Sequence, residues 1–144
     1  MSLRKGKTFS TKHGPNEKPD ISIKNEILKQ TKNEKLPCAV AFEIAKVLQV
    51  SPEKVGKTAD LMNFKLTKCQ LGLFGYQPKK KIVHPQDNIK EDVKNAVSDA
   101  LVQGRLSCKR AWDIASRLHV GKMTVSSSCE AMEIKITDCQ LGAF

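Results

Sequence analysis

The sequence repeats itself at a constant offset of 70 residues. Residues 23–74 align with residues 93–144 without a gap, and 18 of the 52 aligned pairs are identical. The run Cys69-Gln70-Leu71-Gly72 returns as Cys139-Gln140-Leu141-Gly142. A fixed period of this length is typical of duplicated modules. We therefore expect two similar lobes of about fifty residues, which are marginal alone and pack together or dimerise.

The repeat divides the chain into four segments. Residues 1–22 are predicted to be a disordered basic tail, because they offer almost nothing apolar to bury. Residues 23–74 form the first repeat and residues 89–144 the second. Residues 75–88 contain prolines and a run of lysines, and they are predicted to be an exposed basic linker.

Each repeat predicts a mainly helical lobe with short β segments. Apolar spacing predicts a first helix over 23–32, and over 89–103 in the second repeat, where Gly104 would end it. A second helix opens near Leu36 or Leu106. A third begins after Ser51, which fits an N-cap, or near Gly121.

The residues after the third helix alternate between apolar and polar side chains. This pattern predicts short strands near 64–67 and 134–137, which we expect to pair with each other across a pseudo-twofold axis. Thr67 and Gln70 then fit a capping box, as do Thr137 and Gln140. A single helical turn and a continuing strand both remain open at that point.

The five cysteines favour a core role over a disulfide framework. Cys38 recurs as Cys108 and Cys69 recurs as Cys139, whereas Cys129 has Ala59 as its counterpart. No Cys-x-x-Cys pair and no signal peptide are present, which favours a cytoplasmic protein with buried thiols. A redox switch or a metal site built from the four recurring cysteines is the alternative.

The net charge of +10 attracts polyanions. No segment approaches the ~20 apolar residues of a membrane-spanning helix, so no membrane partner is expected. The sequence has no glycine-rich phosphate loop, no nucleophile elbow and no recurring carboxylate pair on a helix face. We therefore expect a protein that is not an enzyme and has neither a cofactor nor a small-molecule substrate.

The succession of helix, tight turn and helix resembles the helix-turn-helix superfamily. The residues that carry the resemblance are Ile44, Ala45, Leu48, Val50, Ser51 and Val55, and at the same offset Ile114, Ala115, Leu118, Val120, Gly121 and Val125. With a preceding helix and a following strand, each repeat is similar to a small winged-helix lobe. Where the superfamily often has glycine in the turn, this chain has Gln49 and His119.

The resemblance implies a DNA-binding protein, a transcriptional regulator with two recognition helices in one chain. The third helix of each lobe would enter the major groove. The candidate DNA-binding residues on these helices are Lys54, Lys57, Lys122, Thr124, Ser126 and Ser127. Phosphate contacts would come from Lys79, Lys80, Lys81, Lys109 and Arg110.

Two further functions stay open beside DNA binding. Lobes of this shape also serve as protein-interaction modules, since a fold does not fix a function, and a homodimer is one such arrangement. The other alternative is the redox or metal sensor, in which Cys38 and Cys69 would approach each other. In the interaction module, a partner would cover the third helices.

Overall fold

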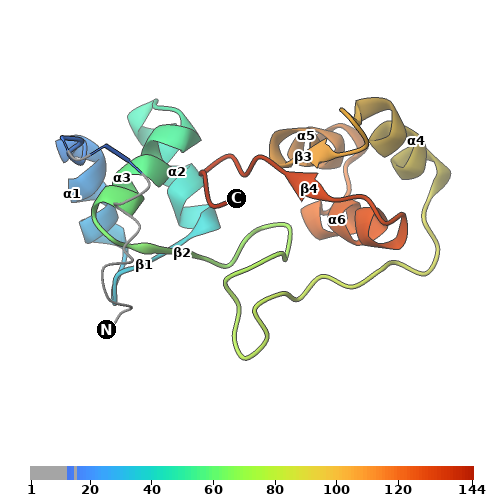
Figure 1. Cartoon of the computed structure of the whole chain (residues 1–144), viewed down its shortest axis with the longest axis horizontal. Helices are drawn as coiled ribbons and strands as arrows, with labels where there is room; N and C mark the ends of the chain where they lie inside the picture. Colours follow the sequence, from blue (N-terminus) through green and yellow to red (C-terminus); the bar gives the residue numbers. More distant parts are fainter. Residues whose placement is uncertain (1–12, 15) are drawn as a thin grey trace. The chain divides into compact units, whose positions relative to one another are not determined.

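The computed structural model describes residues 13–14 and 16–144, and it divides into two compact units (Figure 1). Unit 1 comprises the chain up to Lys68 together with Leu141–Ala143. Unit 2 comprises Cys69–Gln140 together with Phe144. The division falls at Lys68 rather than at residue 74, so the segment predicted as a linker belongs to unit 2. Most of the predicted basic tail, residues 1–12, lies outside the described residues.

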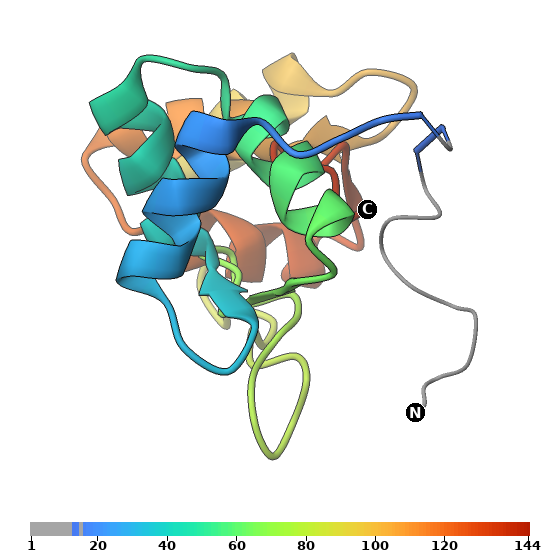
Figure 2. The same ribbon diagram turned by 90° about the vertical axis from the view of Figure 1, so that its left-hand side faces the viewer.

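Unit 1 is built from the first repeat. Its elements are α1 (Ile21–Gln30), β1 (Lys35–Pro37), α2 (Cys38–Leu48), α3 (Pro52–Leu61) and β2 (Lys65–Thr67). Each of the three helices contacts the other two, and their ribbons face the viewer in Figure 2. Ile23 and Ile27 of α1, Ile44 of α2 and Val55 of α3 are fully buried and form the centre of this unit.

Unit 2 repeats the same order of elements. They are α4 (Glu91–Ala100), β3 (Leu106–Ser107), α5 (Cys108–Leu118), α6 (Lys122–Ala131) and β4 (Ile136–Thr137). The core gathers apolar side chains from all three helices, such as Val97, Ile114 and Val125. Leu71, from the end of the first repeat, is fully buried in this core. The described chain is therefore mainly helical, as predicted.

The first helix of each unit differs from its predicted bounds. α1 begins at Ile21, because the carboxylate of Asp20 accepts a hydrogen bond from the backbone N–H of Ile23 at 3.1 Å and caps the helix. α4 ends at Ala100, earlier than predicted. The chain then turns tightly between Val102 and Arg105, and Gly104 supplies the positive φ of +75° within that turn.

In the turns between the second and third helices, a residue other than glycine adopts the left-handed backbone conformation. Gln49 has φ 56° and ψ 44°, and His119 has φ 57° and ψ 42°. In each turn the next backbone N–H, of Val50 or Val120, returns to a helix carbonyl at 3.0 Å and closes the helix end. The hydroxyl of Ser51 accepts the N–H of Lys54, which confirms the predicted cap of α3.

The strands pair within each unit and not with each other. β1 and β2 are parallel, with Leu36 opposite Leu66, and β3 and β4 are parallel, with Leu106 opposite Ile136. The predicted pairing of 64–67 with 134–137 is wrong. The residues expected to open the second helix form the partner strand instead, since this register buries a leucine or isoleucine from each strand.

The recurring segment after the second strand forms a closed loop. The N–H of Cys69 donates to the carbonyl of Phe74 at 3.1 Å, and that of Cys139 donates to Phe144 at 3.0 Å. Gly72 and Gly142 have positive φ values of +74° and +83° inside these loops. Neither the single helical turn nor the continuing strand is present in this part of the described chain.

The segment predicted as an exposed linker is partly packed against unit 2. The backbone N–H groups of Ile82 and Val83 both donate to the carbonyl of Gly72, and Val83 is 5% exposed. The N–H of Gln86 donates to the carbonyl of Ser127 on α6. Most of the segment's other residues are exposed, among them the lysine run 79–81 and residues 84, 85, 87 and 88. Across the described residues, no helix has the length and apolar character needed to cross a membrane.

Candidate nucleic-acid interface

The third helices leave few side chains open to solvent. On α3 only Glu53 and Lys54, both in its first turn, are exposed. On α6 only Met123 is exposed, with 37% of its surface accessible. The broad polar face expected for reading DNA bases is therefore reduced to the first turn of each helix.

Ser126, predicted to contact DNA, is fully buried. Its hydroxyl donates to the carbonyl of Leu71 at 2.7 Å and also lies 3.2 Å from the carbonyl of Met123. The prediction fails because the loop around Leu71 packs directly on α6. The equivalent residue on α3 is Gly56, and a Cβ atom there would lie 1.8 Å from the carbonyl oxygen of Leu141. Both third helices therefore meet a loop carbonyl at the same position.

The other predicted residues of α6 are also engaged within unit 2. Ser127 is half-buried and donates to the side-chain carbonyl of Gln86 at 3.1 Å. Thr124 is half-buried, and its backbone carbonyl accepts the hydroxyls of Ser127 and Ser128. The ammonium of Lys122 lies 4.5 Å from the ring centroid of Trp112 in a cation–π contact. These residues stabilise the unit rather than present free donors.

A segment preceding each repeat covers its third helix. In unit 1, Glu17 forms an ion pair with Lys57, and the imidazole of His13 lies 3.1 Å from the carboxylate of Asp60. The Lys57 ammonium lowers the pKa of Glu17, through its hydrogen bond and its charge. Lys57, a predicted DNA contact, is thus half-buried and paired.

In unit 2 the preceding segment contacts the two equivalent helix positions, Ser127 and Glu130, but from residues that are not the counterparts of Glu17 and His13. Gln86 binds Ser127, and Lys81 forms an ion pair with Glu130, the counterpart of Asp60. The aligned residues, 23–74 and 93–144, begin after these segments. Pro15 and Pro85 are their one shared residue, so identity alone gave little signal.

The remaining predicted phosphate contacts fall into two groups. Lys81 is paired with Glu130, and Lys109 lies 3.2 Å from Asp113 one turn further along α5. Lys79 and Lys80 are exposed and form no ion pair with another described residue. Arg110 is exposed too, and its guanidinium donates to the carbonyl of Ala100 at 3.3 Å.

A set of cations that the sequence reasoning missed lies along the strands of unit 1. Lys35 and Lys65 are direct partners in the parallel register, and both are exposed. Lys32 and Lys68, also exposed, flank the two strands. None of the four forms an ion pair with any residue that the structure describes. We call them the strand lysines.

Unit 2 has cations at equivalent positions. Arg105 and Lys135 immediately precede the paired residues Leu106 and Ile136, and both are exposed. Arg105 and Arg110 line a depression of about 340 Å³. Its other lining residues are Val102, Gln103, Ser107, Thr137 and Asp138.

Like charges placed opposite each other on neighbouring strands destabilise a sheet. The chain nevertheless carries Lys35 with Lys65 and Arg105 with Lys135, a cation at all four equivalent positions. Ammonium and guanidinium groups, together with the hydroxyls of Ser107 and Thr137, are the usual partners of nucleic-acid phosphates. The strands therefore form a better candidate anion surface than the third helices.

The cysteines behave as buried core residues. All five are free thiols, and only Cys139 is partly exposed. Burial raises the pKa of Cys69 and Cys108, and it raises that of Cys129 to about 11. Thiols with raised pKa values are poor nucleophiles and poor metal ligands at neutral pH.

The metal and redox alternatives receive no support from the described part of the chain. It holds no group of three or more His, Cys, Asp or Glu side chains suited to a metal. Cys38 belongs to unit 1 and Cys69 to unit 2, so the two thiols do not lie in one lobe as expected.

No family model, no curated protein and no solved structure matches the chain.

Proposed function

We propose that this protein binds DNA, with the phosphate backbone held by cations beside the short strands. The observation that carries the proposal is the recurrence of an unpaired cation pair in both repeats, Lys35 with Lys65 and Arg105 with Lys135. Such contacts fix a protein on nucleic acid without reading its sequence. They also predict an affinity that falls steeply with salt.

The helix–turn–helix geometry of each unit supports a further part of the proposal. The first turn of α3 exposes Lys54, and the first turn of α6 exposes Met123. In this family of folds the N-terminal residues of the third helix approach the bases. We therefore assign any sequence preference to these first turns. On this basis we propose a transcriptional regulator, a role that requires such a preference.

Fluorescence anisotropy on a mixed-sequence duplex at ~50 and ~200 mM salt tests the proposal. The test variant replaces the four paired cations, Lys35, Lys65, Arg105 and Lys135, with glutamine. The matched control replaces Lys24, Lys46, Lys90 and Lys94 with glutamine. These lysines are also exposed, two in each unit, and they form no ion pair within the described residues. Both variants lose the same net charge.

We expect the test variant to bind at least tenfold more weakly than the parent at low salt, and with a shallower salt dependence. The control should stay within about threefold, because its lysines lie outside the contact. Equal losses in both variants would show that only total charge matters. Binding that disappears on deleting residues 1–12, which carry Arg4, Lys5, Lys7 and Lys12, would assign the contact to the N-terminal segment.

Protein binding is the second candidate function, favoured by one specific observation. Ile21 and Leu28, seven residues apart on α1, are 75% and 51% exposed, and Val47 of α2 is 59% exposed. Residues at this spacing share a helix face. Sedimentation velocity of the parent and of an Ile21→Asp/Leu28→Asp variant tests whether this face joins two copies. A dimer that the variant abolishes would support it.

A further inference from the structure

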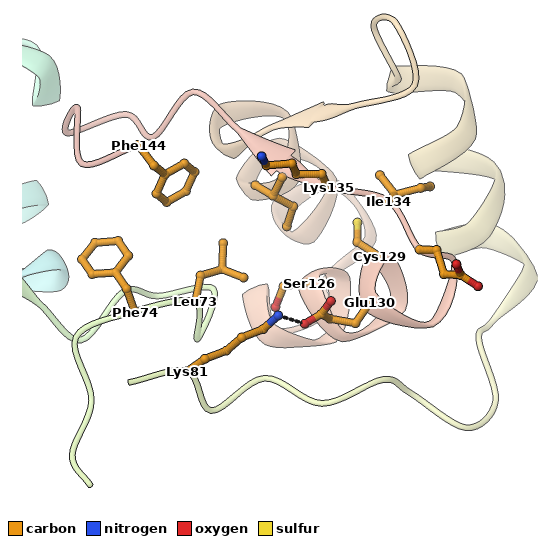
Figure 3. Close-up of a pocket in the computed structure, with 11 residues that line it drawn as sticks. Leu73, Phe74, Lys81, Ser126, Cys129, Glu130, Ile134, Lys135 and Phe144 are labelled. Atoms are coloured by element: carbon orange, nitrogen blue, oxygen red, sulfur yellow. Dashed lines mark ion pairs between the residues drawn. The ribbon is translucent and has the colours of Figure 1, made fainter. Parts of the chain in front are cut away.

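Unit 2 contains a cavity that shares only Lys135 with the proposed DNA-binding surface. It has a volume of about 450 Å³ and lies between α6, the residues leading into β4, and the loop after Cys69 (Figure 3). Its walls are largely apolar, formed by Leu73, Phe74, Ile134, Ile136 and Phe144. Small-molecule sites typically have this size and this apolar lining, with a few polar groups that orient the ligand.

Two aromatic rings form one side of the cavity. Phe74 and Phe144 meet edge to face, with ring centroids 6.0 Å apart. Figure 3 shows both rings beside Leu73 at the same end of the cavity. A flat or branched apolar group would gain favourable contacts against these ring surfaces.

The polar groups of the cavity are mostly satisfied already. The hydroxyl of Ser126 donates to Leu71, and Lys81 is paired with Glu130, as the dashed line in Figure 3 marks. The thiol of Cys129 is uncharged at neutral pH, because burial raises its pKa to about 11. Two exposed charges at the lining are left without an ion pair to any described residue, Lys135 and Glu133.

The repeat shows how this cavity can be closed without disturbing the fold. Unit 1 carries Phe64 at the position equivalent to Ile134, and Phe64 is 8% exposed there. The backbone of this fold therefore accepts a phenyl ring at that position. Ile134 is smaller and only half-buried, and it leaves the corresponding space in unit 2 open to a ligand.

We propose that this cavity binds a small hydrophobic anion, an aromatic or branched aliphatic molecule carrying a single carboxylate or sulfonate. Its apolar body lies between Ile134 and the two phenyl rings. Its anionic group pairs with the ammonium of Lys135, the cation at the lining that forms no ion pair with a described residue. Glu133 disfavours ligands with more than one negative charge.

The test is a fluorescence titration with 1-anilinonaphthalene-8-sulfonate, a hydrophobic monoanion, followed by circular dichroism to confirm that each variant is folded. We expect saturable binding at one site in the parent. Ile134→Phe should weaken it at least tenfold by filling the cavity, whereas Ile134→Leu, which keeps the volume, should bind within about twofold of the parent.

A second pair of variants keeps the test decisive if Ile134→Phe fails to fold. Lys135→Met should weaken binding about fivefold to tenfold, because it removes the charge but keeps the stem. Lys65→Met, the equivalent change in unit 1, should leave it unchanged. Absence of saturable binding, or equal losses at Lys65 and Lys135, overturns the proposal. The Ile134 variants alter no charge, so their effect on ligand binding tests this proposal independently of the proposed DNA binding.

Discussion

The two repeats fill one buried position of the third helix with different residues. Position 59 is alanine in unit 1, and its equivalent in unit 2 is Cys129, which is 1% exposed. A buried thiol packs well as a small apolar group, but it resists ionisation. Its contribution to the stability of the protein therefore depends on pH.

We predict that alkaline pH weakens the fold through Cys129. Burial raises the pKa of the folded thiol from its ordinary value of 9.0 to about 11. The stabilisation is complete below pH 9 and is lost as pH rises to 11, because only the unfolded chain ionises in that interval. The loss amounts to roughly 2 kcal/mol.

Urea unfolding between pH 8 and 11 measures this loss. Cys129→Ala, which copies Ala59 of unit 1, is the control, since lysines and tyrosine titrate in the same interval. The free energy of unfolding of the parent should fall by about 2 kcal/mol more than that of the variant over this interval. Parallel curves for the two proteins would contradict the prediction.

At the scale of elements, local signals in the sequence predicted much of the fold. The period of the apolar residues located all three helices of each repeat, and Ser51 marked the start of α3. The partners of β2 and β4 could not be predicted from the sequence, because β1 and β3 have at most three residues and show no alternation of apolar and polar side chains. Register there depends on burial in the assembled unit.

The candidate site was harder to predict than the helices. Ser126 looks like an exposed serine in sequence, and only the loop that packs on α6 shows that it is buried. Taken one at a time, the strand lysines give no sign of a binding site in the sequence. They became a candidate site once the register placed Lys35 opposite Lys65.

The contact between α3 and a loop carbonyl makes a prediction at the same scale. Gly56→Ala should lower the free energy of unfolding by about 2 kcal/mol, because the new Cβ would lie 1.8 Å from the carbonyl oxygen of Leu141. Helix propensity alone predicts the opposite sign, a gain of about 1 kcal/mol. Thermal and urea unfolding decide between the two, and a stabilised variant would rule out the close approach.

At the scale of the whole molecule, each unit is completed by the end of the other repeat. Leu71, from the first repeat, is buried in the core of unit 2. Leu141, from the second repeat, belongs to unit 1 and is 1% exposed. Its carbonyl oxygen is the atom that approaches Gly56 on α3.

This exchange of chain ends predicts that a mutation at the end of one repeat destabilises the unit formed by the helices of the other repeat. Leu141→Ala should speed native-state hydrogen exchange of α1, α2 and α3, and Leu71→Ala should do so in α4, α5 and α6. Removing a buried leucine costs about 2–5 kcal/mol, which is enough to populate local opening. Hydrogen exchange that becomes faster only in the repeat that carries the mutation would contradict this arrangement of the chain ends.

The same exchange sets the order in which a ribosome can finish the protein. The helices of unit 1 are made first, yet the residue whose carbonyl meets α3 is Leu141, which is made long after α3 ends at Leu61. Domains usually fold in turn from the N-terminus as they are made. Unit 1 therefore cannot be completed until residue 141 has been made, and synthesis that stops before that residue would leave the first three helices without the segment that packs on α3.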